Sequence, residues 1–175
     1  MTTSSALASS EIAWAYPDRA HPAFVLRAGR EEIGWLRFEK DIGAQSTAEL
    51  EGHRWTLEHN GLHHPRVTIR DQASNRAVAE FTPCLTGGGV ARFPNGRLFC
   101  WTREHIWSGT WCFRCKENKS TVCVSQETRP LTAGSRVTVC SDAAQLEEAP
   151  VLVLLAWYLR VLEFEMLTES VVVCG

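Results

Sequence analysis

The sequence has no run of about 18 apolar residues, the minimum length for a transmembrane helix. Residues 1–10 have neither a basic opening nor an apolar core, so they predict no signal peptide. The seven cysteines are an odd number without the spacing of a small disulfide scaffold, which favours free thiols in a reducing compartment. Together these absences predict a cytoplasmic protein.

Catalytic motifs are lacking as well. The glycine run 87–89 has no lysine and hydroxyl of the P-loop kind after it, so a flexible hairpin loop is the better interpretation. His63 and His64 precede a proline beside the Asn60-Gly61 turn, which favours exposed turn residues over a general base. The sequence pairs no nucleophile with an imidazole. We therefore expect a protein without enzymatic activity and without a cofactor.

One cysteine motif has the spacing of half a zinc site. Cys112 and Cys115 form a CxxC pair and Cys123 follows, whereas a zinc site needs four thiolate or imidazole ligands. The chain has no second CxxC, and on a strand the sulfurs of residues three apart point to opposite faces. We expect these cysteines to be packing residues. A zinc or thiol site at Cys112, Cys115 and Cys123 stays open as an alternative.

The main apolar stretch is Val151–Leu159, which carries no charge. Glu147, Glu148 and Pro150 are typical of a helix start, because proline needs no N–H partner there and acidic side chains favour the positive end of the helix dipole. At about 1.5 Å per residue the stretch spans roughly 14 Å, about half of a bilayer core. A helix that is apolar all round must be covered on every side. We expect a helix over about 147–165, enclosed by the rest of the chain.

Short alternating segments fill most of the chain before that helix. Trp55 and Leu57 face one way and their polar neighbours the other, and Val67 and Ile69 alternate in the same manner, as a sheet with one buried face requires. About ten to twelve strands at roughly 8 to 12-residue spacing indicate an antiparallel sandwich or barrel. The strand candidates are 24–26, 33–38, 54–58, 66–70, 78–81, 98–102, 106–115, 121–126 and 136–140.

The length of 175 residues suits one domain with a substantial core. We expect a flexible N-terminal segment over 1–20, because it is rich in Ser, Thr and Ala. The barrel domain would cover 21–167, and residues 168–175 would form a C-terminal tail or one more short strand.

Two segments resemble a known superfamily. The stretch Gly96-Arg97-Leu98-Phe99-Cys100-Trp101 within a long β-meander, followed by the apolar helix from Pro150 to Leu159, is similar to the tubby C-terminal-like superfamily, and within it to LURP-one-related and phospholipid-scramblase-like proteins. The resemblance spans roughly residues 20–165. It implies an all-β fold with one helix: an antiparallel, about twelve-stranded closed barrel around a central hydrophobic C-terminal helix. Because such a helix fills the lumen, ligands are expected on the outer surface or at a barrel mouth.

Basic residues concentrate in the middle of the chain. The net charge is −2, yet residues 61–140 hold 11 Lys and Arg against 5 Asp and Glu. Each contact of a basic side chain with a phosphate is a charge-assisted hydrogen bond. The candidate anion-binding and lipid-binding residues are Arg92, Arg97, Arg103, Arg114, Lys116 and Lys119.

The resemblance implies a non-enzymatic domain that binds an anionic phospholipid headgroup and lies peripherally on a membrane. The first alternative is a protein-interaction or structural module without a lipid ligand. The second is the zinc or thiol site described above. Nucleic acid is not expected as a partner, because the total charge is negative and the sequence carries no known nucleic-acid-binding motif.

Overall fold

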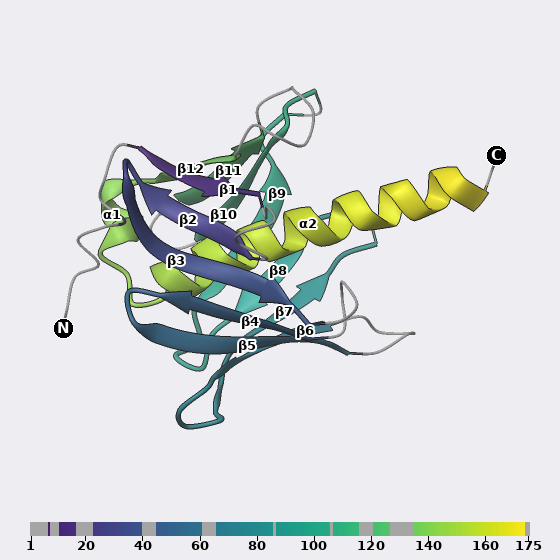
Figure 1. The fold of residues 1–175 in the computed structure, drawn as a ribbon. Coiled ribbons are helices and arrows are strands. Elements are labelled where there is room, and N and C mark those ends of the chain that lie inside the picture. Colours follow the sequence, from purple (N-terminus) through teal and green to yellow (C-terminus); the bar gives the residue numbers. More distant parts are fainter. Residues whose placement is uncertain are drawn as a thin grey trace.

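The computed structural model describes residues 7, 11–16, 23–39, 45–60, 66–85, 87–105, 107–115, 121–126 and 135–173, with side chains up to residue 163. In this part of the chain twelve strands are followed by two helices (Figure 1). The strands are β1 (Ile12–Ala15), β2 (Phe24–Ala28), β3 (Glu31–Phe38), β4 (Gln45–Leu50), β5 (His53–Asn60), β6 (Arg66–Asp71), β7 (Ala77–Pro83), β8 (Gly89–Arg92), β9 (Leu98–Arg103), β10 (Thr110–Cys115), β11 (Thr121–Gln126) and β12 (Ser135–Val139). The helices are α1 (Ser141–Ala144) and α2 (Ala149–Val173).

The strands form one closed antiparallel barrel. Each strand pairs with its neighbours in sequence, and β1 pairs with both β2 and β12, which closes the ring. Ile12 of β1 lies opposite Ala28 on one side and Val137 on the other. A closed ring leaves no strand edge unpaired. The predicted fold class, an antiparallel twelve-stranded barrel closed around a hydrophobic C-terminal helix, is confirmed.

β1 lies inside the segment 1–20, which we expected to be flexible. Its side chains Ile12 and Trp14 are fully buried in the core. The expectation was wrong for this part, where Ile12 and Trp14 alternate with alanine as on a strand with one buried face. Their order comes from pairing on both sides in the closed barrel, since isolated short strand pairs are at best marginally stable.

α2 fills the lumen of the barrel, as Figure 1 shows. Side chains from Val151 to Tyr158 are at most 5% exposed. They pack against inward-facing strand residues: Trp157 stacks on Trp14 with 5.9 Å between ring centroids, and Tyr158 stacks on Phe38 at 5.5 Å. The helix is apolar on all sides because strands cover it on all sides.

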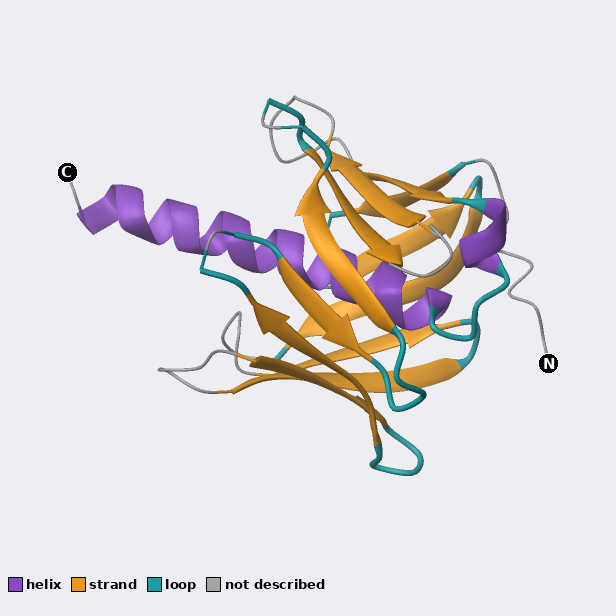
Figure 2. Cartoon of the chain, turned by 180° about the vertical axis from the view of Figure 1, so that it is seen from behind, coloured by secondary structure: helices purple, strands orange, loops and turns teal. Residues whose placement is uncertain are grey.

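α2 is longer than the sequence predicted. It begins at Ala149, near the expected start, but runs to Val173, past the expected end at about 165 and into the segment 168–175 that was expected to be a tail or strand. The chain carries no glycine or proline between Arg160 and Val173 that would end the helix. Figures 1 and 2 show the last part of α2 leaving the barrel.

The two ends of the barrel differ (Figure 2). We call the end at which α2 begins the base, and the opposite end, where α2 leaves, the exit end. At the base, β2 and β3 are joined by a tight turn at residues 29–30, and β4 and β5 by one at 51–52. At the exit end, residues 84–88 connect β7 to β8, and residues 104–109 connect β9 to β10. These two connections lie beside the emerging helix.

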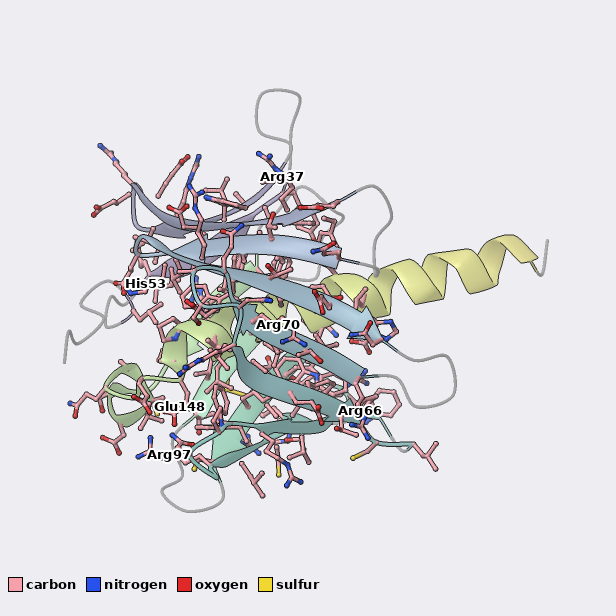
Figure 3. The ribbon with its side chains drawn as sticks, turned by 90° about the horizontal axis from the view of Figure 1, so that it is seen from below. Arg37, His53, Arg66, Arg70, Arg97 and Glu148 are labelled. Atoms are coloured by element: carbon pink, nitrogen blue, oxygen red, sulfur yellow. A yellow bond between two sulfur atoms is a disulfide. The ribbon has the colours of Figure 1, made fainter. Side chains whose placement is uncertain are left out.

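The outer face of the barrel is polar and holds its charges in pairs. Arg70 lies 3.6 Å from the Glu58 carboxylate, and Arg66 lies 3.5 Å from that of Glu80, on neighbouring strands (Figure 3). Exposed ion pairs of this kind contribute at most about 1 kcal/mol each. The charged side chains on this part of the surface are therefore explained by their contact with water.

Candidate functional site

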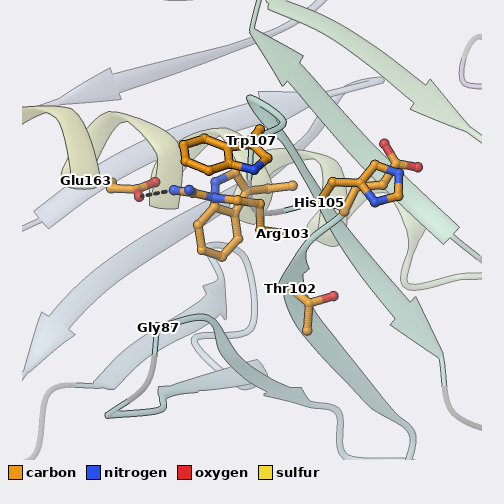
Figure 4. Close-up of a pocket in the computed structure, with 8 residues that line it drawn as sticks. Gly87, Thr102, Arg103, His105, Trp107 and Glu163 are labelled. Carbon is orange, nitrogen blue, oxygen red and sulfur yellow. Dashed lines mark ion pairs between the residues drawn. The ribbon is translucent and has the colours of Figure 1, made fainter.

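A pocket opens at the exit end, between the two connections and α2 (Figure 4). Its volume is about 800 Å³, within the roughly 300–1,000 Å³ of typical small-molecule sites. The strands supply its wall and α2 supplies one acidic side chain. The lining residues are Gly87, Thr102, Arg103, Glu104, His105, Trp107, Trp111 and Glu163. Ligands were expected on the outer surface or at a barrel mouth, and this pocket lies at a mouth.

Two arginines converge on the Glu163 carboxylate, which lines this pocket. Arg103 Nη2 lies 3.8 Å from Glu163 Oε1, and Arg160 Nη1 donates a hydrogen bond to Glu163 Oε2. Arg160 is 6% exposed. Burial lowers the pKa of its guanidinium, and the charge of Glu163 opposes that shift. Arg103 is the more accessible cation, with 44% of its side chain exposed.

An indole supports both arginines. The guanidinium carbon of Arg103 lies 5.1 Å from the ring centroid of Trp111, and that of Arg160 lies 5.9 Å from it. Trp111 is itself 8% exposed and stacks on Trp101 at 5.4 Å. Cation–π contacts of this range are each worth about 0.5–2 kcal/mol. Trp111, which is packed in the core, therefore orients the guanidiniums of both arginines.

The outer rim of the pocket is shaped by a tight turn. Ser108 N donates to the carbonyl of His105 at 2.9 Å, Thr110 N donates to Ser108 Oγ at 2.9 Å, and Glu104 N donates to the carbonyl of Thr110 at 3.0 Å. These bonds hold Trp107 at the tip of the connection, where it is 97% exposed. The strand candidate 106–115 was therefore too long at its start, because β10 begins at Thr110.

The structure does not gather the predicted basic residues into one patch. Arg103 is in the pocket at the exit end, whereas Arg92 and Arg97 flank the turn between β8 and β9 at the base. Six residues of extended chain separate Arg97 from Arg103, roughly 20 Å. Arg114, on the outer face of β10, lies 3.9 Å from the Glu104 carboxylate. Lys116 and Lys119 fall outside the described residues.

Several pocket residues were not predicted. Trp107 was hidden because the segment from residue 106 onward was interpreted as a strand, although the Ser108-Gly109 dipeptide is a turn signal. Arg160 and Glu163 were recognised only as the end of the apolar stretch. Their contact with Arg103 depends on how deeply α2 enters the barrel, which no local pattern reports.

The predicted cysteine set does not come together as a ligand set. Cys112 and Cys123 lie opposite each other on β10 and β11 and form a disulfide, with 4.1 Å between their Cα atoms. Cys115 points to the other face and is buried in the core. The expectation of free thiols was wrong for this pair, because only the strand register shows that the two residues are adjacent. Cytoplasmic location therefore loses the support it drew from free thiols.

Comparison of the chain with protein-family models, curated proteins and solved structures gave no match. The resemblance to tubby-like and scramblase-like proteins therefore stays a prediction. Fold and site together define a helix-filled antiparallel barrel with a pocket at one mouth that two indoles and the guanidinium of Arg103 line. Among the described residues, no helix combines the length and the hydropathy needed to cross a bilayer.

Proposed function

We propose that the protein is a non-enzymatic module that binds a phospholipid headgroup at a membrane surface, and that the pocket at the exit end is the binding site. The observation that carries the proposal is Arg103, whose guanidinium faces the pocket at 3.8 Å from Glu163 and beside the exposed Trp107 (Figure 4). A guanidinium presents two parallel N–H donors to a phosphate, which gives both affinity and orientation.

Arg103 can pair with a phosphate without leaving Glu163 as an isolated charge. Its separation of 3.8 Å from the Glu163 carboxylate is longer than a hydrogen bond. Glu163 also accepts a hydrogen bond from Arg160. When a phosphate takes the guanidinium of Arg103, the carboxylate of Glu163 therefore keeps a cationic partner and is not left as an isolated charge.

Arg103 is the cation that an anionic headgroup would meet in the pocket. The two carboxylates that line the pocket have other cationic partners: Glu163 accepts a hydrogen bond from the buried Arg160, and Glu104 lies 3.9 Å from Arg114. A basic side chain near an anionic membrane contributes about 1 kcal/mol of binding, and salt screens that contribution. We therefore expect binding that prefers anionic membranes and weakens as the salt concentration rises.

Co-sedimentation with lipid vesicles tests this function. The protein is mixed with neutral phosphatidylcholine vesicles or with vesicles that also contain phosphatidylserine, at low and at physiological salt. Arg103→Gln should weaken binding to the anionic vesicles by roughly fivefold, the equivalent of one lost charge. Arg92→Gln is the matched control, because Arg92 is exposed but lies at the base.

Two outcomes would contradict the proposal. In the first, Arg92→Gln weakens vesicle binding as much as Arg103→Gln does, which would move the contact away from the exit end. In the second, the protein binds no vesicles in any condition, which would favour the protein-interaction module.

A further inference from the structure

Two large hydrophobic side chains are fully exposed in the described part of the chain. Leu85 and Trp107 have exposed fractions of 109% and 97%. Leu85 is in the β7–β8 connection and Trp107 in the β9–β10 connection, so both are at the exit end. Two strand spacings separate the connections, roughly 10 Å. The pocket that contains Arg103 lies next to both, because Gly87 and Trp107 line it.

The backbone holds Leu85 outward. Gly87 N donates to the carbonyl of Cys84 at 3.1 Å, and Cys84 N donates to the carbonyl of Gly88 at 3.1 Å. Gly87 and Gly88 have φ of +87° and +75°, and a Cβ on Gly88 would be 2.3 Å from the carbonyl oxygen of Trp101. The connection therefore lies tightly against β9. Leu85 precedes this packed part of the connection with its side chain exposed, and the side chain of Trp107 is exposed in the β9–β10 connection.

The exposure of both side chains is costly in water. Burial of a leucine side chain away from water is favourable, and an indole contributes a still larger apolar area. Neither side chain recovers this within the fold. An apolar phase outside the molecule would recover it for both at once, since they project from the same end.

We propose that the exit end is the face that enters the membrane, with Leu85 and Trp107 inserted at the boundary between headgroups and acyl chains and Arg103 at the level of the phosphates. This inference rests on the proposed function and adds to it how the barrel is oriented on the bilayer. The occupant of the surface is a phospholipid bilayer.

The arrangement favours a bilayer over a protein partner. A stable protein interface takes about 800 Å² of continuous surface from each side, whereas these are two single side chains with a pocket beside them. A fluid bilayer surrounds an inserted side chain on all sides, so single apolar side chains such as Leu85 and Trp107 can insert separately. Tryptophan prefers the membrane interface, where its ring is apolar and its N–H is hydrated. The accessible guanidinium of Arg103 in the pocket can also pair with the phosphates of a leaflet.

Vesicle binding by variants of the two tips separates this inference from the proposed function. Leu85→Ser and Trp107→Ser should each weaken binding roughly tenfold, to neutral and to anionic vesicles alike, because they remove apolar contact. Arg103→Gln should weaken binding to anionic vesicles more than binding to neutral ones. Unchanged binding of Leu85→Ser and Trp107→Ser would overturn the inference, while the proposed headgroup site would stand or fall with Arg103→Gln.

Quenching of tryptophan fluorescence by brominated lipids gives a direct readout of insertion. The wild-type protein should be quenched, and Trp107→Phe should lose most of the quenching. Trp35→Phe is the control, since Trp35 is on the outer face of β3 under Arg37 and should not reach the lipid. Equal quenching of Trp107→Phe and wild type would overturn the inference. So would self-association in the absence of vesicles that Trp107→Ser abolishes, because the surface would then bind a second copy.

Discussion

Arg97 and Glu148 are bound to each other across 51 positions of the chain. Arg97 Nη1 donates to both carboxylate oxygens of Glu148 at 3.0 Å (Figure 3). Asn95 Nδ2 donates to the same carboxylate at 2.6 Å. Glu148 is 2% exposed and directly precedes α2, so this contact fastens the turn between β8 and β9 to the start of the central helix.

Arg97→Ala should destabilise the fold by about 1–3 kcal/mol. The substitution leaves the buried Glu148 carboxylate without its cation, which costs about 3–5 kcal/mol in a fully buried pair. We expect a smaller loss here because the Arg97 side chain is 38% exposed, so water already weakens its interaction with Glu148. Chemical denaturation measures the loss. Arg92→Ala, at an exposed position across the same turn, should change the stability by less than about 0.5 kcal/mol.

Trp157→Asp should prevent folding. Loss of the buried indole alone costs about 3–5 kcal/mol, and the new carboxyl would lie between Trp14 and Phe24 without a partner. The total is comparable to the about 5–15 kcal/mol by which a whole domain is stable. Trp107→Asp is the same substitution at an exposed tip and should fold normally. A cooperatively unfolding Trp157→Asp protein would contradict the enclosed position of α2.

Gly88→Ala should cost more stability than Gly96→Ala. Both glycines have positive φ, +75° and +87°, and an alanine in this region is strained by about 1–2 kcal/mol. Only at Gly88 would the new Cβ also meet an atom, the carbonyl oxygen of Trp101 at 2.3 Å. That overpacking adds about 1–3 kcal/mol. Thermal unfolding of the two variants compares them, and equal losses would show that the β7–β8 connection is not packed against β9.

The stability should fall at high pH because of Tyr158. Burial raises the pKa of its phenol from 10.0 to about 12. The folded state therefore holds the proton more tightly than the unfolded state, so the contribution is complete below pH 10 and is lost as the pH rises toward 12. Two pKa units correspond to about 3 kcal/mol. Denaturation of wild type and Tyr158→Phe across this range should show a steeper loss for wild type, and parallel curves would contradict a buried phenol.

The sequence predicted those elements of the fold that a single local pattern indicates. The uncharged stretch Val151–Leu159 predicted the enclosed helix, and the alternation around Trp55 predicted β5. β4 was missed because Ser46 and Ala48, which are small, occupy its buried positions. β8 was missed because it is four residues long and begins with a glycine.

The site was less predictable, because it is made of segments far apart in the sequence. Arg103 was predicted as a basic candidate, but its contacts with Glu163 and Trp111 depend on barrel closure and on the depth of α2. The separation of Arg97 from Arg103 also follows from strand direction. Composition showed that the middle of the chain is basic. It could not show that these basic residues lie at opposite ends of the barrel.

Amide hydrogen exchange with and without anionic vesicles tests most directly whether the exit end is the membrane-binding face. Backbone amides in exposed connections exchange fast unless a partner covers them. With vesicles, we predict slower exchange in the connections 84–88 and 104–109 and unchanged exchange in the base turns 72–76 and 93–97. Protection confined to the base turns, or no change at either end under conditions in which the protein sediments with vesicles, would contradict the account.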